Sequence, residues 1–363
     1  MKIHMVGGFL GSGKTTAIIS AAKLLIRQGL TVGVITNDQG KYLVDTNFMR
    51  LEDIPTVEVN GGCFCCNYTD FDESLDKLVD QIQPDVVFAE SVGSCADVVA
   101  TVLQPLLQFK DKSPEDISLS VFTDARLLRA YLDGLDLPFQ DGVIYVFEKQ
   151  IEEASILILN KIDLMDVKQG EELLKKAKER YPDKIILKQT SLTPEGVSSW
   201  LNLMAEEEHY PLDKKPLSIN YQVYGAGEQV LAWYDGVYEI NADSKQVADW
   251  ISSFLSGLQK AIKSKNIPVG HLKLLIRDSH KHQKISMTSL YEMEEFQFRP
   301  NDEWKSPVTL LINARLECSQ LEISQLMQSV FNQNQKEHAL LVKIVDEEAF
   351  HPGFPTPTHR LIQ

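Results

Sequence analysis

The stretch Gly8-Phe9-Leu10-Gly11-Ser12-Gly13-Lys14-Thr15 decides the fold of the first half of the chain. It fits the pattern G-x-x-x-x-G-K-[ST] and lies between an apolar run and a helical pattern that begins at Lys14. Its glycines allow successive backbone N–H groups to turn inward around phosphate oxygens, and the positive end of the following helix dipole faces the same point. We therefore predict a nucleoside triphosphate site on a strand, a loop and a helix.

Two side chains at the end of this loop have separate expected roles. Lys14 would reach the β- and γ-phosphates, and the Thr15 hydroxyl would bind Mg²⁺. The alternative is a glycine-rich turn without a ligand, which the strand–loop–helix context disfavours.

Short β-branched runs alternate with helical patterns from residue 2 to about residue 205. Some runs, such as residues 156–159, are continuously apolar, as expected for strands that are buried on both faces of a sheet. This rhythm predicts an α/β domain over residues 1–205, with a mostly parallel P-loop sheet as the middle of three layers. The expected strands are Lys2–Val6, Thr31–Thr36, Thr56–Val59, Asp85–Ala89, Ser118–Thr123, Ser155–Leu159 and Lys184–Lys188.

The periodicity fails over residues 206–216, where charge and proline accumulate, so we place a linker there. Residues 217–363 are predicted to form a smaller α+β domain, to which the sequence assigns no role. The expected strands are Tyr221–Ile240, His271–Arg277, Lys284–Leu290, Val308–Glu317 and Ala339–Val345, and the expected helices are Gln246–Lys263 and Leu321–Asn332.

Composition and charge exclude several classes of partner. The 363 residues include 36 basic and 51 acidic side chains, a formal net charge of −15, which is the wrong sign for binding nucleic acid or an anionic membrane. No apolar stretch approaches the roughly 20 residues that span a bilayer. Three of the five cysteines fall within four residues, which favours metal or redox chemistry in a reduced compartment. We expect a cytoplasmic protein.

The identity of the base is indicated by Asn160-Lys161-Ile162-Asp163, which follows a buried strand. A carboxylate such as that of Asp163 can accept hydrogen bonds from guanine N1–H and the 2-amino group together, whereas adenine offers neither donor. Ser191, after the last strand of this half, is a further candidate for the base pocket, although a helix N-cap explains it equally well. The arrangement favours GTP over ATP.

Two further strand ends point toward the same phosphates, because ligands of such sheets lie at the carboxyl ends of the strands. Asp38 and Glu90 could hold Mg²⁺ directly or through water, and Glu90 could also orient the attacking water. Gly93 would let a backbone N–H approach the γ-phosphate. Capping of the following helices is the alternative role for the two acidic residues.

A second constellation follows the third strand, where Gly61 and Gly62 precede Cys63, Cys65 and Cys66. The glycines permit the sharp bend that three thiols need to converge on one cation. Thiolates favour Zn²⁺ and other soft or borderline ions, with Co²⁺ accessible, and three ligands leave a tetrahedral site one short, so that the metal can be passed on. A redox pair or inert buried thiols remain as alternatives.

In this order, the phosphate loop G-G-F-L-G-S-G-K-T-T, the C-x-C-C loop, E-S-V-G-S and N-K-I-D resemble the CobW-like metallochaperone GTPases, over about residues 1–205. The resemblance implies hydrolysis of GTP to GDP and phosphate, and delivery of Zn²⁺ or Co²⁺ from the C-x-C-C loop to a client metalloprotein or metal-cofactor enzyme. A homodimer is allowed. The implied nucleotide residues are Gly11, Ser12, Gly13, Lys14, Thr15, Thr16, Asn160, Lys161 and Asp163; Lys14, Asp38 and Glu90 would act in catalysis; Thr15, Asp38 and Glu90 would bind Mg²⁺; and Cys63, Cys65 and Cys66 would bind the transition metal.

Some features depart from the family pattern. Gln39 stands in N-D-Q-G where many relatives have N-E-F-G, a difference that bears on water positioning, and Cys95 after E-S-V-G-S is unusual. Cys95 could complete the metal site or be a buried core cysteine. His280 and His282 could form a second metal site, although a solvated polar loop is the simpler interpretation. A non-catalytic nucleotide-gated zinc store or sensor, and an ATP-dependent small-molecule kinase, remain alternatives for the whole chain.

Overall fold

A computed structural model describes residues 1–110, 113–205, 217–288, 298–299 and 303–362. The chain divides into two compact units, each with its own sheet. The first unit comprises Met1–Gln39, Met49–Glu228 and Phe354–Gln363, and the second comprises Gly40–Phe48 and Gln229–Gly353. The predicted linker, residues 206–216, lies outside the described residues.

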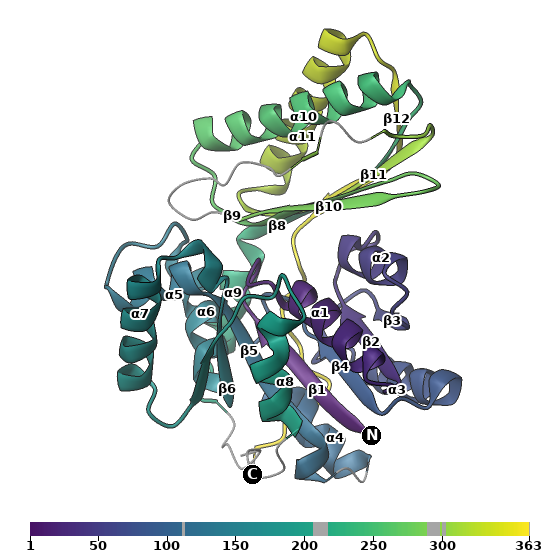
Figure 1. Cartoon of the computed structure of the whole chain (residues 1–363). Coiled ribbons are helices and arrows are strands. Elements are labelled where there is room, and N and C mark those ends of the chain that lie inside the picture. The colour runs from purple at the N-terminus through teal and green to yellow at the C-terminus, as the bar shows by residue number, and fades with distance from the viewer. Residues whose placement is uncertain (111–112, 206–216, 289–297, 300–302, 363) are drawn as a thin grey trace. The chain divides into compact units, whose positions relative to one another are not determined.

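The first unit is built on a seven-stranded sheet in which every pair of neighbouring strands is parallel (Figure 1). The strand order is β3-β2-β4-β1-β5-β6-β7. The predicted parallel sheet is therefore confirmed. Its strands are β1 (Lys2–Gly8), β2 (Val32–Asn37), β3 (Thr56–Val59), β4 (Val86–Glu90), β5 (Ile117–Asp124), β6 (Ile156–Asn160) and β7 (Ile185–Lys188).

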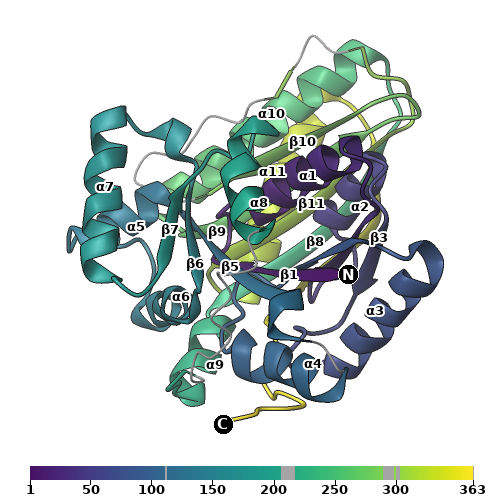
Figure 2. The same ribbon diagram turned by 60° about the horizontal axis from the view of Figure 1, so that its bottom comes forward.

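Helices cover both faces of this sheet, with α1 and α8 on one face and α4 and α6 on the other (Figures 1 and 2). Short helical turns occupy Val99–Leu103, Pro114–Asp116, Ile162–Leu164 and Glu195–Val197. The longer helices are α1 (Lys14–Arg27), α3 (Tyr68–Ile82), α4 (Gln104–Phe109), α5 (Ala125–Leu132), α6 (Asp141–Glu153), α7 (Val167–Arg180), α8 (Ser198–Ala205) and α9 (Tyr221–Gln229). Helix α2 (Val44–Leu51) carries the chain from the second unit back to the first.

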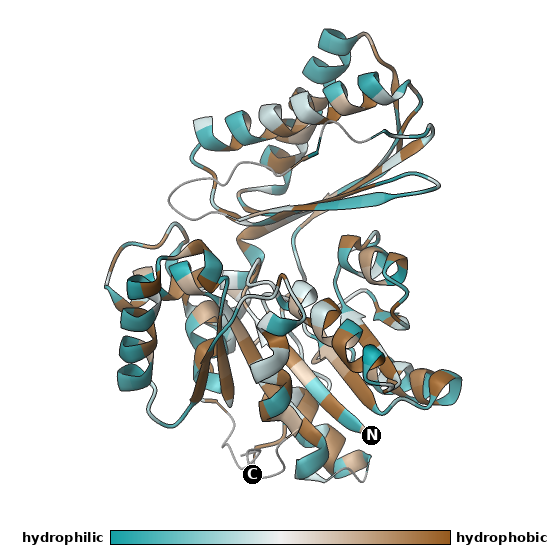
Figure 3. Ribbon diagram, in the orientation of Figure 1, coloured by the Kyte–Doolittle hydropathy of each residue, from teal (hydrophilic) through white to brown (hydrophobic). Residues whose placement is uncertain are grey.

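The central strands are apolar because both of their faces are covered (Figure 3). All residues of β4, β5 and β6 are buried. Trp200 of α8 is fully buried against Phe88 and Phe122, at ring-centroid distances of 5.7 and 5.0 Å, and its Nε1 donates to Ser120 Oγ at 2.8 Å. Burying each such large side chain contributes roughly 1.5–3 kcal/mol, so the sheet is a rigid base for the loops at its edge.

The strand order places the predicted site residues at one edge of the sheet. Strand β1 has β4 and β5 as its neighbours, while the chain runs from β1 to β2, so the order reverses beside β1. Ligands bind at such a switch point, outside the carboxyl ends of the strands. The segments that follow β1, β2, β4, β6 and β7 are the ones that carry the predicted nucleotide residues.

The second unit contains a five-stranded antiparallel sheet in the order β10-β9-β11-β8-β12. Side chains of α10 and α11 form one hydrophobic core with one face of the sheet, and each helix begins with a capping box, at Asp243 and Ser319. The predicted α+β fold is confirmed. The elements are β8 (Leu231–Ile240), α10 (Ser244–Ser264), β9 (Val269–Arg277), β10 (His282–Met287), β11 (Val308–Glu317), α11 (Gln320–His338) and β12 (Val342–Phe350).

The segment Gly40–Phe48 belongs to this second unit through polar contacts with the sheet. The backbone N–H of Val44 donates to Asn313 Oδ1 at 2.8 Å, and Lys273 and Lys284 both pair with Asp45, the latter at 2.6 Å. This segment directly follows Asp38 and Gln39 in the chain. The second unit is therefore joined covalently to the end of β2 as well as to α9.

The structure differs from the prediction in the type of one element and in the unit to which three segments belong. Residues 221–229 form helix α9 rather than a strand, because their buried side chains recur at helical spacing and Asn220 Oδ1 accepts the N–H of Gln222 at 3.0 Å as an N-cap. Helix α9 and Phe354–Gln363 belong to the first unit, and Gly40–Phe48 belongs to the second.

Within the described residues, every helix is too short or too polar to cross a bilayer.

Candidate functional site

The phosphate loop joins β1 to α1 in a conformation that requires its glycines. Gly11 and Gly13 have φ of 70° and 90°, and a Cβ on Gly13 would lie 2.4 Å from Asn160 Nδ2. The hydroxyl of Ser12 is buried without a hydrogen-bond partner among the described residues. Lys14 Nζ donates to Gly8 O at 2.6 Å and to Phe9 O at 3.3 Å. The loop thus holds the Lys14 ammonium group and the unpaired Ser12 hydroxyl where phosphate oxygens would lie.

Oxygen ligands for a hard cation meet beside this loop. Thr15 Oγ1, in the first turn of α1 next to Thr16, donates to Glu90 Oε1 at 2.8 Å. Glu90 ends β4 and pairs in register with Thr36 of β2, and Asp38 comes two residues after Thr36, directly after the end of β2. The chemistry of this oxygen set fits Mg²⁺, which prefers carboxylate and hydroxyl oxygens. Thr15 and Glu90 are brought into contact.

Gly93 lies against the phosphate loop. A Cβ at this position would lie 2.6 Å from Leu10 Cδ2 and 3.1 Å from Leu10 Cα, so a side chain here would displace Leu10 of the loop. Its carbonyl oxygen accepts a hydrogen bond from the buried Gln150 Nε2 of α6 at 3.0 Å. The structure therefore brings the segment after β4 directly onto the phosphate loop.

Asn160 ties the predicted base side of the site to the phosphate loop. Its Nδ2 donates to Ser12 O at 2.7 Å, and its Oδ1 accepts from Ser191 Oγ at 2.7 Å. Lys161 has φ of 60°, and its Nζ pairs with Asp124 at 3.2 Å. Asp163 follows in a short 3-10 turn and is exposed, as a residue that contacts a bound base from the rim would be. Ser191 is thus linked to Asn160.

The cysteine loop brings three sulfur atoms together. Cys63 and Cys65 are buried and Cys66 is half-buried. Cys63 Sγ lies 3.3 Å from Cys66 Sγ, and Cys65 Sγ lies 3.8 Å from Cys66 Sγ. In the part of the chain that the structure describes, this is the one group of three or more side chains of ligand type that converge closely enough to hold a metal ion.

The three thiols of this cluster differ in the direction in which their pKa values are shifted. Hydrogen bonds with Cys65 and then Cys66 hold the pKa of Cys63 well below its ordinary value. The hydrogen bond with Cys63 raises the pKa of Cys66 to about 11 and also raises the pKa of Cys65. The hydrogen bonds of the cluster thus favour the thiolate form of Cys63, and a thiolate is the form that binds metal.

Asn37, for which the sequence predicted no role, connects the cysteine loop to β2. Its Nδ2 donates to Gly62 O at 2.6 Å and to Val59 O at 3.1 Å, and its Oδ1 accepts the N–H of Phe64 at 2.8 Å. One side chain therefore holds the loop on both sides of Cys63, and the next residue in the chain is Asp38. The only feature of the sequence that could have indicated this role is the position of Asn37 at the end of an apolar strand.

The chain's last residues also contact the cysteine loop. The backbone N–H of Thr358 donates to Cys65 O at 2.8 Å, and its hydroxyl donates to Cys66 O at 2.7 Å. Arg360 pairs with the buried Asp97 at 2.6 Å, which fixes this part of the tail. No sequence pattern near residue 358 indicates this role, because the contact spans almost the whole chain.

The two histidines that the sequence singled out lie in the second unit. The backbone N–H of His280 donates to Asp278 Oδ1 at 2.6 Å in a turn, and the ring of His282 contacts that of Phe48 at a centroid distance of 5.6 Å. Neither belongs to the sulfur cluster.

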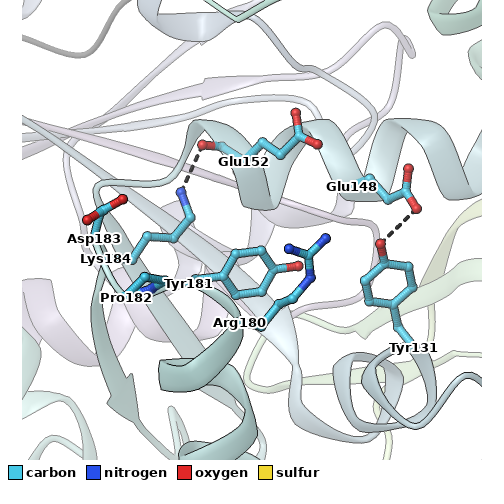
Figure 4. A pocket seen from close by; sticks show the side chains of 8 residues that line it. All are labelled: Tyr131, Glu148, Glu152, Arg180, Tyr181, Pro182, Asp183 and Lys184. Atoms are coloured by element: carbon cyan, nitrogen blue, oxygen red, sulfur yellow. Dashed lines mark hydrogen bonds between the residues drawn. The ribbon is translucent and has the colours of Figure 1, made fainter.

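A separate cavity of about 350 Å³ lies at the other edge of the first sheet (Figure 4). It is bounded by the last turns of α5, α6 and α7 and by the residues that precede β7, so it faces the amino ends of the strands. Tyr131 OH donates to Glu148 Oε1 at 2.8 Å, and Lys184 Nζ donates to Glu152 O at 2.8 Å. None of the predicted site residues lines it. Its lining residues are Tyr131, Glu148, Glu152, Arg180, Tyr181, Pro182, Asp183 and Lys184.

Curated relatives match about half of the chain. It is 28% identical over 191 residues to the zinc chaperone CobW of Sinorhizobium sp, an alignment that covers 45% of this chain and 51% of that protein. It is 23% identical over 220 residues to the zinc-regulated GTPase metalloprotein activator 1 of Dictyostelium discoideum, covering 53% of this chain and 46% of that protein. The chain thus spans about half the length of the curated relatives it matches.

Among solved structures, HypB from Helicobacter pylori in complex with nickel is 16% identical to this chain, with a TM-score of 0.42. The likeness covers 61% of this chain and 91% of that one. Residues 2–188 match the family model described as CobW/HypB/UreG, nucleotide-binding domain. Since that match spans more than half of the chain, the protein belongs to the CobW/HypB/UreG nucleotide-binding family.

Proposed function

We propose that this protein hydrolyses GTP to GDP and phosphate, and that its nucleotide state controls a zinc ion held by Cys63, Cys65 and Cys66 for transfer to a client protein. The observation that carries the proposal is the side chain of Asn37. It bonds the cysteine loop at Gly62 and Phe64 and immediately precedes Asp38. A change at the phosphate end of β2 therefore has a direct path to the metal loop.

GTP would bind at the phosphate loop through local groups, because the net charge of −15 repels an anion. Lys14 Nζ would exchange Gly8 O and Phe9 O for the β- and γ-phosphates, while the loop amides and the start of α1 would surround the other oxygens. Thr15, Asp38 and Glu90 would hold Mg²⁺, which supplies charge neutralisation when it is bound. Glu90 would orient the attacking water.

Asp163 is proposed to select guanine, and its replacement tests both the nucleotide and the reaction. The wild-type protein with Mg²⁺ should release phosphate from GTP and not from ATP. In Asp163→Asn, the loss of two hydrogen bonds to a carboxylate, at about 1.5–3 kcal/mol each, should weaken GTP binding on the order of 10²-fold or more. The variant should gain affinity for xanthosine triphosphate, because an amide N–H can donate to its 2-oxo group.

Asp166→Asn is the matched control, since Asp166 is an exposed carboxylate nearby that caps α7. It should leave the nucleotide preference unchanged. Competition of unlabelled GTP, ATP and xanthosine triphosphate against a fluorescent GTP analogue, together with phosphate release, measures these effects. Equal binding of ATP and GTP by the wild-type protein would remove the guanine assignment. An absence of GTP turnover, with or without zinc, would favour a non-catalytic zinc store or sensor.

A further inference from the structure

We propose that Cys95 is a fourth thiolate ligand of the metal, and that it closes the site from the segment that follows Glu90. This inference rests on the proposed function, because it assumes that the C-x-C-C loop binds metal. It adds a residue that lies 29 positions beyond Cys66 in the chain. It also converts an open three-sulfur site into a closed four-sulfur site.

The spacing of the sulfur atoms carries the inference. Cys95 Sγ lies 3.9 Å from Cys65 Sγ, which in turn lies 3.8 Å from Cys66 Sγ. In a tetrahedral Zn²⁺ site with Zn–S bonds of about 2.3 Å, neighbouring sulfur atoms are about 3.8 Å apart. All four cysteines are free, and their separations are far above the length of about 2.05 Å of a disulfide bond. The sulfur of Cys95 therefore stands at a ligand-to-ligand distance from Cys65, and it lies outside the group of three sulfur atoms that are all within 4.8 Å of one another.

The backbone around Cys95 is fixed by contacts that do not depend on a metal. Gln150 Nε2 donates to Cys95 O at 2.8 Å as well as to Gly93 O, and the N–H of Cys95 donates to Val92 O at 2.9 Å. Cys95 is 2% exposed, so its sulfur cannot turn toward solvent. Its position facing Cys65 is thus built into the turn after β4.

The cysteine loop is held from the other side by the tail. The backbone N–H of Thr356 donates to Cys66 Sγ at 3.3 Å, a contact that stabilises a thiolate, and Thr358 bonds the carbonyl oxygens of Cys65 and Cys66. The four sulfur atoms are therefore contributed by two segments, each of which is fixed by its own hydrogen bonds. Small side-chain adjustments would let them surround one ion.

The position of Cys95 has a consequence for release. It stands two residues after Gly93, which lies against the phosphate loop, and five after Glu90, which contacts Thr15. If the loss of the γ-phosphate moves this turn, Cys95 withdraws and a three-sulfur site with an open position remains. A closed four-thiolate site retains zinc, and an open one can exchange it. Cys95 would thus be the ligand through which hydrolysis opens the site.

Cobalt substitution tests the inference directly. Co²⁺ is added to the full-length protein with Mg²⁺ and a non-hydrolysable GTP analogue, and the sulfur-to-cobalt charge-transfer absorbance in the near ultraviolet is measured. Its intensity rises with the number of thiolates. Cys95→Ser and Cys95→Ala should each lose about one quarter of this absorbance at saturation, because one ligand of a four-thiolate site is removed. Cys318→Ser, in the second unit, should leave it unchanged.

The outcomes separate this inference from the proposed function. Retention of the full absorbance and cobalt affinity in both Cys95 variants would overturn the inference and leave the three-sulfur loop intact. An unchanged spectrum in Cys65→Ser, or no cobalt binding by the wild-type protein, would overturn the proposed site and this inference with it. Binding of the GTP analogue at wild-type affinity shows that the Cys95 variants are folded, and the smaller alanine side chain serves if serine disturbs the buried turn.

Discussion

Replacing both Cys65 and Cys66 by serine is expected to abolish nucleotide-dependent zinc binding. Structural zinc sites with four ligands contribute about 10–16 kcal/mol, or about 3 kcal/mol for each ligand. The loss of two thiolates should therefore weaken zinc binding by at least about 10⁴-fold, since each 1.4 kcal/mol is a factor of ten. Serine keeps the size of the side chain but not the soft sulfur donor. Zinc competition against a chelating dye of known affinity measures the change.

The control for this double variant is Cys318→Ser, which changes a half-buried cysteine of the second unit. It should bind zinc like the wild-type protein. The double variant should still bind GTP, because neither sulfur is among the predicted nucleotide contacts. Unchanged zinc affinity in the double variant would show that the metal binds elsewhere and would leave the loop as a cluster of inert thiols.

Lys14→Ala is expected to reduce GTP hydrolysis by on the order of 10²–10³-fold, the loss found when one preorganised donor to the developing charge is removed. Lys14 is 6% exposed and its ammonium group already lies inside the phosphate loop, where it bonds Gly8 O and Phe9 O. The glycines determine the conformation of the loop, so alanine should preserve it. The substitution removes the only charge that this loop directs at the phosphates. Phosphate release under saturating GTP measures the effect.

Lys23→Ala is the matched control, because Lys23 lies later on the same helix and forms an ion pair with Glu52. It should retain wild-type turnover. Lys14→Ala should also bind zinc with one affinity whether GTP is present or not, because Lys14 no longer holds the γ-phosphate against the segments that follow β2 and β4. Wild-type hydrolysis by Lys14→Ala would show that this loop is not the site of the reaction.

Much of the fold could be predicted because the patterns that determine it lie within short stretches of the sequence. The apolar runs that became β4 and β6 are buried on both faces, and the glycines of the phosphate loop mark the first turn. Residues 221–229 show where this approach fails. Their tyrosines and valine favour a strand by propensity, but helical burial against the first unit and the Asn220 cap decide the outcome.

The residues of the candidate site also divide into those that the sequence predicts and those that only the fold reveals. Lys14, Thr15 and the three cysteines of the loop lie in short motifs whose chemistry can be read from residue type and spacing. Asn37, Gln150 and Thr358 could not be assigned, because their roles arise from contacts with residues that are distant in the sequence. Outside a motif such as the one that contains Asn160, asparagine and glutamine have no distinctive pattern in the sequence. The supports of the metal loop therefore emerge only with the fold.

The most direct test of the account is a zinc titration of the purified protein in three states: without nucleotide, with Mg²⁺ and GDP, and with Mg²⁺ and a non-hydrolysable GTP analogue. Competition with a chelator gives the dissociation constant in each state. The account predicts the tightest binding with the GTP analogue, by at least about tenfold, or 1.4 kcal/mol, over the GDP state. Equal zinc affinity in all three states would contradict nucleotide control of the metal site.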